Sequence, residues 1–205
     1  MARTRTSTSP NWQDLLADAA SAAPALVGCL LMRRTGHGEI IRARILETEA
    51  YLPDDPASHS FVGPTTRNRS MFGRAGLAYV YRIHRSFCLN VVTGPPGRGE
   101  AVLLRAVEVI EGNEAAAALR AAASVGRQPP AARSLADGPG KLCQALAITT
   151  DLDGVDLLAA GNLTLEHGEA RVPLEVSTRI GISKAADLPL RFFERGHPGV
   201  SRRGV

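Results

Sequence analysis

The sequence "EIIRARILETEAYLPDDPASHSF", residues 39–61, contains the clearest strand of the chain, so the fold is built outward from it. Up to Tyr51 the stretch alternates and includes β-branched side chains, which predicts a strand. The apolar segment "GCLLMRR" at 28–34 precedes it, and the Gly-containing turn "TGHG" at 35–38 lies between the two. We therefore expect two antiparallel strands joined by a short turn.

Three kinds of reactive side chain gather at the end of the second strand. Glu47, Glu49 and Tyr51 share one face, because alternate residues of a strand point the same way. A Pro/Asp turn then leads to His59. A carboxylate at a strand end in an apolar cleft can take a proton from water, although a solvated strand edge is the commoner meaning of such a pair. No His or Cys at ligand spacing accompanies His59, so neither a metal nor a cofactor is expected.

The other elements follow from periodicity and turn residues. Helices are expected at 11–20, opened by Ser9-Pro10, and again from Pro24. Strands are expected at 77–83, 86–92, 101–109, 174–182 and 188–194, an alanine-rich helix at 112–124, and a short helix within 138–148. The Pro/Asp/Ser/Gly-rich segment 52–70 is a long loop of the kind that often carries function.

Length and composition allow one domain in a reducing compartment. The 205 residues are 44% apolar, which suffices for a sizeable core, so we expect a disordered polar tail at 1–9 and a single domain at 10–205. Cys29, Cys88 and Cys143 are far apart and match neither a disulfide framework nor a zinc knuckle. With no apolar signal region or membrane-spanning stretch, the expected location is the cytoplasm.

Positive charge is concentrated in one window. Between Pro56 and Gly99 there is no Asp or Glu. The window holds Arg67, Arg69, Arg74, Arg82, Arg85 and Arg98, together with His59 and His84. Such a window suggests a phosphate-facing surface, since arginine forks match phosphate geometry, but a solvated loop remains the alternative. "GPGK" at 138–141 offers backbone N–H groups and Lys141 to a phosphate, and alone it is a weak motif.

The aromatic residues also cluster near this window. Tyr79 and Tyr81 lie on one face of a predicted strand. Tyrosines at alternate strand positions serve core packing more often than they form a platform for stacking bases, and both readings stay open here.

Eight short motifs in order carry a family resemblance. They are "RILETEAY", "SHS", "RNRSMF", "YVY", "FCLN", "VLLRAVE", "GPGKLCQALAI" and "PLRFF". In this order and spacing the chain resembles the alkyladenine (3-methyladenine) DNA glycosylase family, from about Ala22 to Ser201. The resemblance implies an α+β fold: a single mixed domain around a curved antiparallel β-sheet, with flanking helices and a protruding β-hairpin that enters the DNA minor groove.

The resemblance also implies a reaction. A damaged purine would be flipped out of duplex DNA, because the bond to be cut cannot be reached inside the stack. Glu49 would activate the water that hydrolyses the N-glycosidic bond, and Arg105 would hold the carboxylate and the water. Because no lysine stands near Glu49 as a nucleophile, the product would be an abasic site without a strand break. The expected partner is duplex DNA containing damaged purines, bound by a monomer.

Further residues take roles only through this resemblance. The base pocket would be lined by Tyr51, His59, Tyr81, Asn90 and Ile180, with Tyr81 opposite His59 and Tyr51, and Ile180 offering its carbonyl to the water. Backbone contacts would come from Arg67, Arg69, Arg82, Arg85 and Lys141. His84 would be the wedge that fills the space left by the flipped nucleotide. Many members have tyrosine there, and the hairpin of this chain is one residue shorter than their pattern.

Three other functions compete with this one. A non-catalytic damaged-DNA-binding protein would not need Glu49. An RNA-binding module is less expected, because the sequence has no aromatic RNP-type motif. A hydrolase of free nucleosides would be indifferent to duplex length. Incubation with alkylated duplex followed by alkali separates them, since only a glycosylase gives strand cleavage after the alkali step.

Overall fold

Strand β2 (Ile40–Tyr51) is the centre of a single antiparallel sheet in the computed structural model, which describes residues 11–123, 131 and 134–201. The sheet order is β3-β4-β5-β2-β1-β6, and β7 pairs with β8, which pairs with β2. The bounds are β1 Leu30–Arg34, β3 Ala78–Ile83, β4 Ser86–Thr93, β5 Glu100–Glu111, β6 Leu163–Glu166, β7 Leu174–Ser177 and β8 Arg191–Glu194. The expected tail at 1–9 lies outside the described residues.

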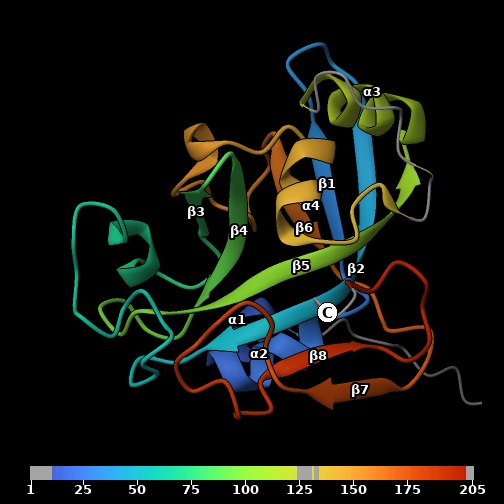
Figure 1. Cartoon of the computed structure of the whole chain (residues 1–205). Coiled ribbons are helices and arrows are strands. Elements are labelled where there is room, and N and C mark those ends of the chain that lie inside the picture. Colours follow the sequence, from blue (N-terminus) through green and yellow to red (C-terminus); the bar gives the residue numbers. More distant parts are fainter. Residues whose placement is uncertain (1–10, 124–130, 132–133, 202–205) are drawn as a thin grey trace, which may run out of the picture.

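Strand β2 changes neighbours along its length. Its first half pairs with β1, from Ile40 to Arg44, whereas Glu47 to Glu49 pair with β8. On its other edge β2 pairs with β5, and the register shifts on both sides of Glu47. Such irregularities bend a strand and increase its twist. Figure 1 shows the result: β2 runs beside β1, then turns toward β8. The curved antiparallel sheet expected from the sequence is confirmed.

Helices cover one face of this sheet. They are α1 (Trp12–Leu15), α2 (Ala19–Leu26), α3 (Asn113–Ala123) and α4 (Pro139–Ala145), with 3-10 turns at Arg69–Phe72 (η1) and Thr150–Leu152 (η3). The main core joins Leu26 of α2 and Leu142 of α4 to Leu31, Ile45 and Leu104 of the strands. All five side chains are fully buried, so the apolar face of the sheet is closed to water. The α+β class is therefore confirmed.

The N-terminal helices differ from the prediction. The helix expected over 11–20 ends at Leu15, because the Asp18 side chain accepts a hydrogen bond from the Ser21 amide at 2.8 Å and so caps a new helix. The Ala19 amide donates to the buried carboxylate of Glu100 at 2.8 Å. Pro24 does not begin a helix but lies inside α2, which ends two residues later.

Two strand predictions also need correction. Strand β6, "LTLE", was missed because four residues give too short an alternating pattern. The strand expected over 174–182 stops at Ser177. Beyond it the chain turns inward at Arg179, which is buried. No helix among the described residues is long and apolar enough to cross a membrane. The three cysteines are free and buried.

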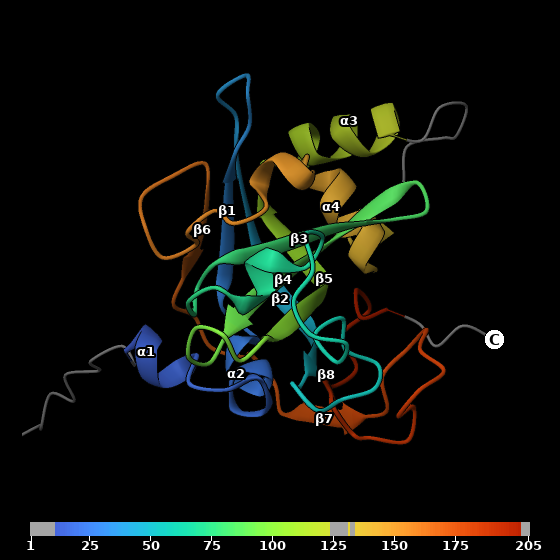
Figure 2. The same cartoon turned by 90° about the vertical axis from the view of Figure 1, so that its left-hand side faces the viewer.

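The protruding hairpin consists of β3 and β4. Ile83 pairs with Ser86, so only His84 and Arg85 form the turn. The four residues from Arg82 to Arg85 are exposed. Figure 2 shows the hairpin reaching outward beside α4, and the Ser86 hydroxyl donates to the Gly140 carbonyl at 3.0 Å. Because Ser86 directly follows the turn, this contact fastens the hairpin to α4 close to its tip.

Candidate active site

The two faces of the sheet have different chemistry. Val80, Leu89 and Val102 point into the main core. Their neighbours point the other way, and pairing across the strands aligns Tyr79 with Asn90, Asn90 with Leu103, and Leu103 with Glu49. This row crosses four strands, so strand alternation alone brings an aromatic ring, an amide and a carboxylate to one surface.

A cavity of about 360 Å³ lies over this surface. Its volume is within the range of small-ligand sites. Its lining includes the predicted site residues Tyr51, His59, Tyr81, Asn90 and Arg105, together with Tyr79. Ile180 closes it from the C-terminal loop, and Ile83 lies toward the hairpin tip. The structure thus brings the predicted base-pocket residues together in one cavity.

Glu49 lies directly behind this lining and is fully buried. One carboxylate oxygen, Oε2, accepts from the Tyr51 hydroxyl at 2.9 Å. The other, Oε1, accepts from the Ile180 amide at 2.8 Å and lies 3.3 Å from Nη1 of Arg105. Burial, followed by the neighbouring Glu49 carboxylate, raises the pKa of Tyr51, which keeps the phenol protonated as a donor. Ile180 thus contacts Glu49 through its N–H, and the predicted contact of its carbonyl with water stays a prediction.

Glu47 has different partners although it lies on the same strand face. Its carboxylate accepts from the Ser201 amide and hydroxyl, each at 2.7 Å, and pairs with Arg105 at 3.2 Å. Arg191 of β8 donates to the same carboxylate. Glu47 therefore accepts from four donors, two of them arginines, and fixes Arg105, which in turn contacts Glu49.

The aromatic wall has an arrangement that differs from the expected one. The His59 and Tyr81 rings contact each other edge-to-face, with centroids 4.5 Å apart, instead of facing each other across a slot. Nδ1 of His59 lies 2.8 Å from the Tyr79 hydroxyl. Burial, helped by the charge of Arg67, lowers the pKa of His59, so its imidazole is neutral near pH 7.

Two residues that support the site, Arg179 and Asp55, were not predicted from the sequence. Arg179 forms a buried ion pair with Asp55 and donates to the Ala50 carbonyl at 3.0 Å. Its guanidinium lies 4.7 Å from the Tyr51 ring centroid. Arg179 therefore fixes the loop that presents the Ile180 amide, on the same strand end that carries Glu49. No motif signalled this pair, because Asp55 and Arg179 are distant in sequence.

The structure also shows where Asn90 and the residues predicted to contact the DNA backbone lie. The Asn90 side chain donates to the Tyr79 carbonyl at 2.9 Å, which sets its orientation in the cavity. Arg67 donates to the Arg82 carbonyl at 2.8 Å and so joins the long loop to the hairpin. The predicted residues Arg67, Arg69, Arg82, Arg85 and Lys141 are all exposed. Lys141 differs from the others, because its amino group is paired with Asp137 at 2.7 Å.

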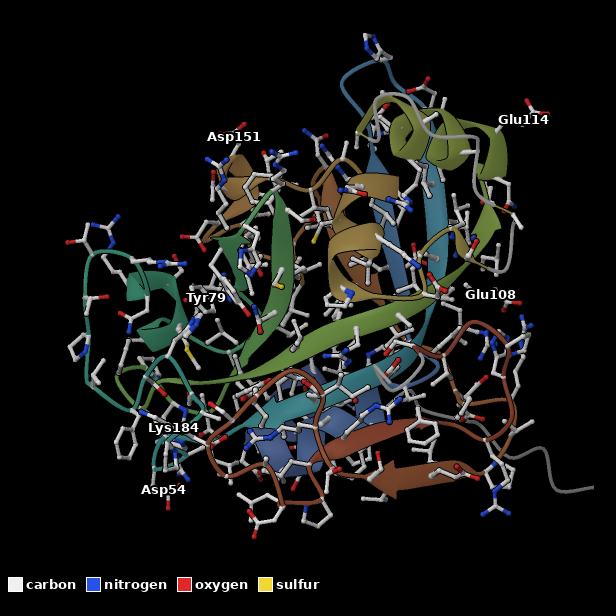
Figure 3. All side chains as sticks on the ribbon, in the orientation of Figure 1. Asp54, Tyr79, Glu108, Glu114, Asp151 and Lys184 are labelled. Atoms are coloured by element: carbon white, nitrogen blue, oxygen red, sulfur yellow. The ribbon has the colours of Figure 1, made fainter. Side chains whose placement is uncertain are left out.

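Other charged side chains form ion pairs away from the cavity. Arg44 pairs with Glu108 at 3.0 Å and also with Glu194. Figure 3 shows Glu108 on the opposite side of the molecule from Tyr79, so this cluster stands apart from the cavity. Within the described part of the chain, no group of three or more His, Cys, Asp or Glu side chains could hold a metal ion.

Comparison with known proteins gives the class of the molecule. The family model for methylpurine-DNA glycosylase matches residues 13–198. A protein of Methanoculleus marisnigri, whose name assigns it to the 3-methyladenine DNA glycosylases, is 50% identical over 91% of this chain and 95% of its own length. The DNA-3-methyladenine glycosylase of Mus musculus is 46% identical over 89% of this chain and 58% of the mouse protein.

These matches identify a DNA glycosylase, an enzyme of DNA repair whose substrate is DNA. The chain belongs to the methylpurine-DNA glycosylase family. The family and the enzyme class predicted from the sequence are thus confirmed.

Proposed function

We propose that this chain excises alkylated purines such as 3-methyladenine from duplex DNA by hydrolysing the N-glycosidic bond. Two observations support the substrate class. The relatives carry 3-methyladenine in their names. The cavity is walled by Tyr51, Tyr81 and His59, and aromatic faces attract a cationic purine ring more strongly than a neutral one. His59, neutral through its lowered pKa, adds no repulsion.

The damaged nucleotide must leave the duplex to reach this cavity, since its sugar bond is inaccessible in the stack. The exposed tip of the β3–β4 hairpin beside the cavity would fill the space it leaves. Ile83 is suited to join the cavity to this tip, because it lines the cavity and is 43% exposed. His84, at the turn, is the wedge in this proposal.

Glu49 is the proposed base, and its hydrogen bonding is the observation that carries the proposal. A carboxylate has about four lone-pair positions. Ile180 and Arg105 occupy those of Oε1, whereas Tyr51 occupies only one of Oε2. The remaining position of Oε2 can accept a hydrogen bond from one water at the cavity floor. The carboxylate would orient that water and stabilise the positive charge that develops on the sugar.

The reaction would stop at the abasic site. An alkylated purine that already carries positive charge leaves without further protonation, so one carboxylate suffices. No lysine is among the described residues that line the cavity, so water is the proposed nucleophile. A reaction through water leaves the phosphodiester chain intact.

The test is base release from a duplex oligonucleotide containing one alkylated purine, followed by alkali. We expect Glu49→Gln to bind this duplex but to lose single-turnover base release by about 10²–10⁴-fold, the usual worth of general-base assistance. A variant that keeps more than about a tenth of the wild-type rate would remove Glu49 from the base's role. Binding by the wild-type chain without release at any pH would instead favour a non-catalytic lesion-binding protein.

A further inference from the structure

A second hollow adjoins the active-site cavity. This outer groove, of about 460 Å³, is bounded by the loop after β2 and by the loop between β7 and β8, which contains Lys184. It shares His59, Tyr79 and Ile182 with the first cavity. A ligand that extends beyond the flipped base on that side would therefore enter the outer groove next.

Two apolar side chains on the rim of the outer groove are exposed to solvent. Phe61 is 51% exposed and Val62 is 80% exposed. Their loop is nevertheless fixed, because the Asn68 side chain donates to the carbonyls of His59 at 2.8 Å and Gly63 at 3.0 Å. A large aromatic side chain held in water by an ordered loop suggests a surface that is covered when a partner binds.

The charge of the outer groove specifies the partner. Arg67 and Lys184 line it, and no Asp or Glu is among its described lining residues. Neither cation forms an ion pair with any other residue that the structure describes. Figure 3 shows Lys184 on the same side of the molecule as Tyr79. Two cations that form no ion pair within the described residues, beside an exposed aromatic ring, match a phosphate joined to a flat base.

We propose that the outer groove binds the nucleotide next to the damaged one on the same DNA strand. Its base stacks on Phe61 and its phosphate lies between Arg67 and Lys184. The inference rests on the proposed function, because it needs the damaged base in the adjoining cavity. It adds to that function a second unstacked nucleotide, and with it a dependence of excision on the base that flanks the lesion.

The test uses a fluorescent base, 2-aminopurine, placed on the 5′ or the 3′ side of an alkylated purine in a duplex. With the wild-type chain we expect fluorescence to rise at one of these positions, because the probe leaves the DNA stack. Phe61→Ala should abolish this rise and weaken binding of the lesion duplex by at least about fivefold, the lower end of what a lost base–aromatic stack gives. Val62→Ala is the matched control, since it shortens a neighbouring exposed side chain that has no aromatic face.

The cations are tested separately. Lys184→Gln should reduce the dependence of log affinity on log salt by about one phosphate contact.

The outcomes separate the two proposals. If the wild-type chain releases the base while the probe stays stacked on both sides, the outer groove does not hold a nucleotide and the proposed function stands. Equal binding by wild type and Phe61→Ala has the same meaning and would point to a protein partner for this rim. If the wild-type chain releases no base, the proposed function itself fails.

Discussion

Glu47 and Glu49 show how two like residues on one strand face come to differ. Glu47 accepts from Ser201 and pairs with Arg105 and Arg191, so its charge is neutralised within the fold. Glu49 has one arginine, one amide and one phenol, and lies against the cavity lining. The difference arises from partners on β5, β8 and the C-terminal residues, which are remote in sequence.

The first of these carboxylates should matter more for stability. Removing one member of a buried ion pair costs about 3–5 kcal/mol, because the other charge stays buried and unpaired. We expect Glu47→Gln to lower the melting temperature clearly more than Glu49→Gln, since it takes from buried Arg191 the one carboxylate that pairs with it among the described residues, whereas Arg105 keeps Glu47 in the second variant. Calorimetry of the two variants beside the wild type provides the measurement. Equal melting temperatures would mean that Glu47 is not the structural member of the pair.

A prediction about pH follows from His59. Its pKa is lowered in the folded protein by burial and by Arg67, so the unfolded chain takes up this proton first as pH falls. The stability contributed by neutral His59 is therefore present above the ordinary histidine pKa and lost below it. Protonation would also place a positive charge beside a cationic base. The rate at which cationic bases are released should therefore fall as the pH decreases.

Arg67→Gln should raise the pH at which base release begins to fall (the acid limb of the pH profile), because it removes one cause of the lowered pKa of His59. NMR titration of His59 and single-turnover release at saturating DNA measure the two effects. Arg69→Gln is the matched control, since it removes a neighbouring charge that does not contribute to the shift. An acid limb that moves equally in both variants would assign the effect to DNA binding rather than to His59.

At the scale of elements, the sequence predicted what local patterns determine. Strands β2 to β5 follow from β-branched alternation, which also grouped Glu49 with Tyr51 and Tyr79 with Tyr81 on shared strand faces. Asn90 was assigned to the pocket only through the family resemblance. The C-terminal loop could not be predicted in this way. Its inward turn depends on the buried pair of Arg179 and Asp55, a long-range contact with no periodic signal. Local propensity likewise failed at Pro24, which tertiary packing holds inside α2.

The hairpin turn contains backbone strain at its proposed wedge. His84 has a φ of 49°, a conformation that side chains other than glycine rarely adopt. Such a residue costs on the order of 1 kcal/mol or more and is found at functional sites, where the surrounding structure holds it. The turn has only two residues, in keeping with a hairpin one residue shorter than the expected family pattern. His84 is exposed at this turn.

Three variants at this position separate strain from wedging. His84→Ala keeps the strain and removes the ring, so affinity for lesion duplex should fall about five- to 150-fold, the loss of one stacking side chain. His84→Gly should bind as weakly as His84→Ala but melt at a higher temperature. His84→Tyr should tighten lesion binding. Equal flipping by all of these, read from a fluorescent base opposite the lesion, would mean that another hairpin residue is the wedge.

At the scale of the whole molecule, the bent sheet separates stability from function. One face is closed by α2 and α4 over an apolar core, and the other carries the cavity, the hairpin and the arginine-rich loop. The ion pairs of Glu108 lie on the opposite side from Tyr79 (Figure 3). In the basic window, Arg74 pairs with Asp156 and Arg98 pairs with Glu100, whereas Arg67, Arg69, Arg82 and Arg85 form no ion pair with another described residue. Positive charge that is not neutralised within the fold favours association with a polyanion in one orientation.

This asymmetry predicts which arginines set the salt dependence of DNA binding. Arg69→Ala and Arg85→Ala should each lower the slope of log affinity against log salt by about one, if each side chain contacts one phosphate. Lys141→Ala should change it less, because Asp137 already pairs with that amino group. The control is Arg171→Ala, an exposed arginine that lies 3.4 Å from Glu108, on the side away from the cavity. Titrations at four salt concentrations measure all the slopes, and equal slopes for Arg69→Ala, Arg85→Ala and Arg171→Ala would place the DNA on another face of the molecule.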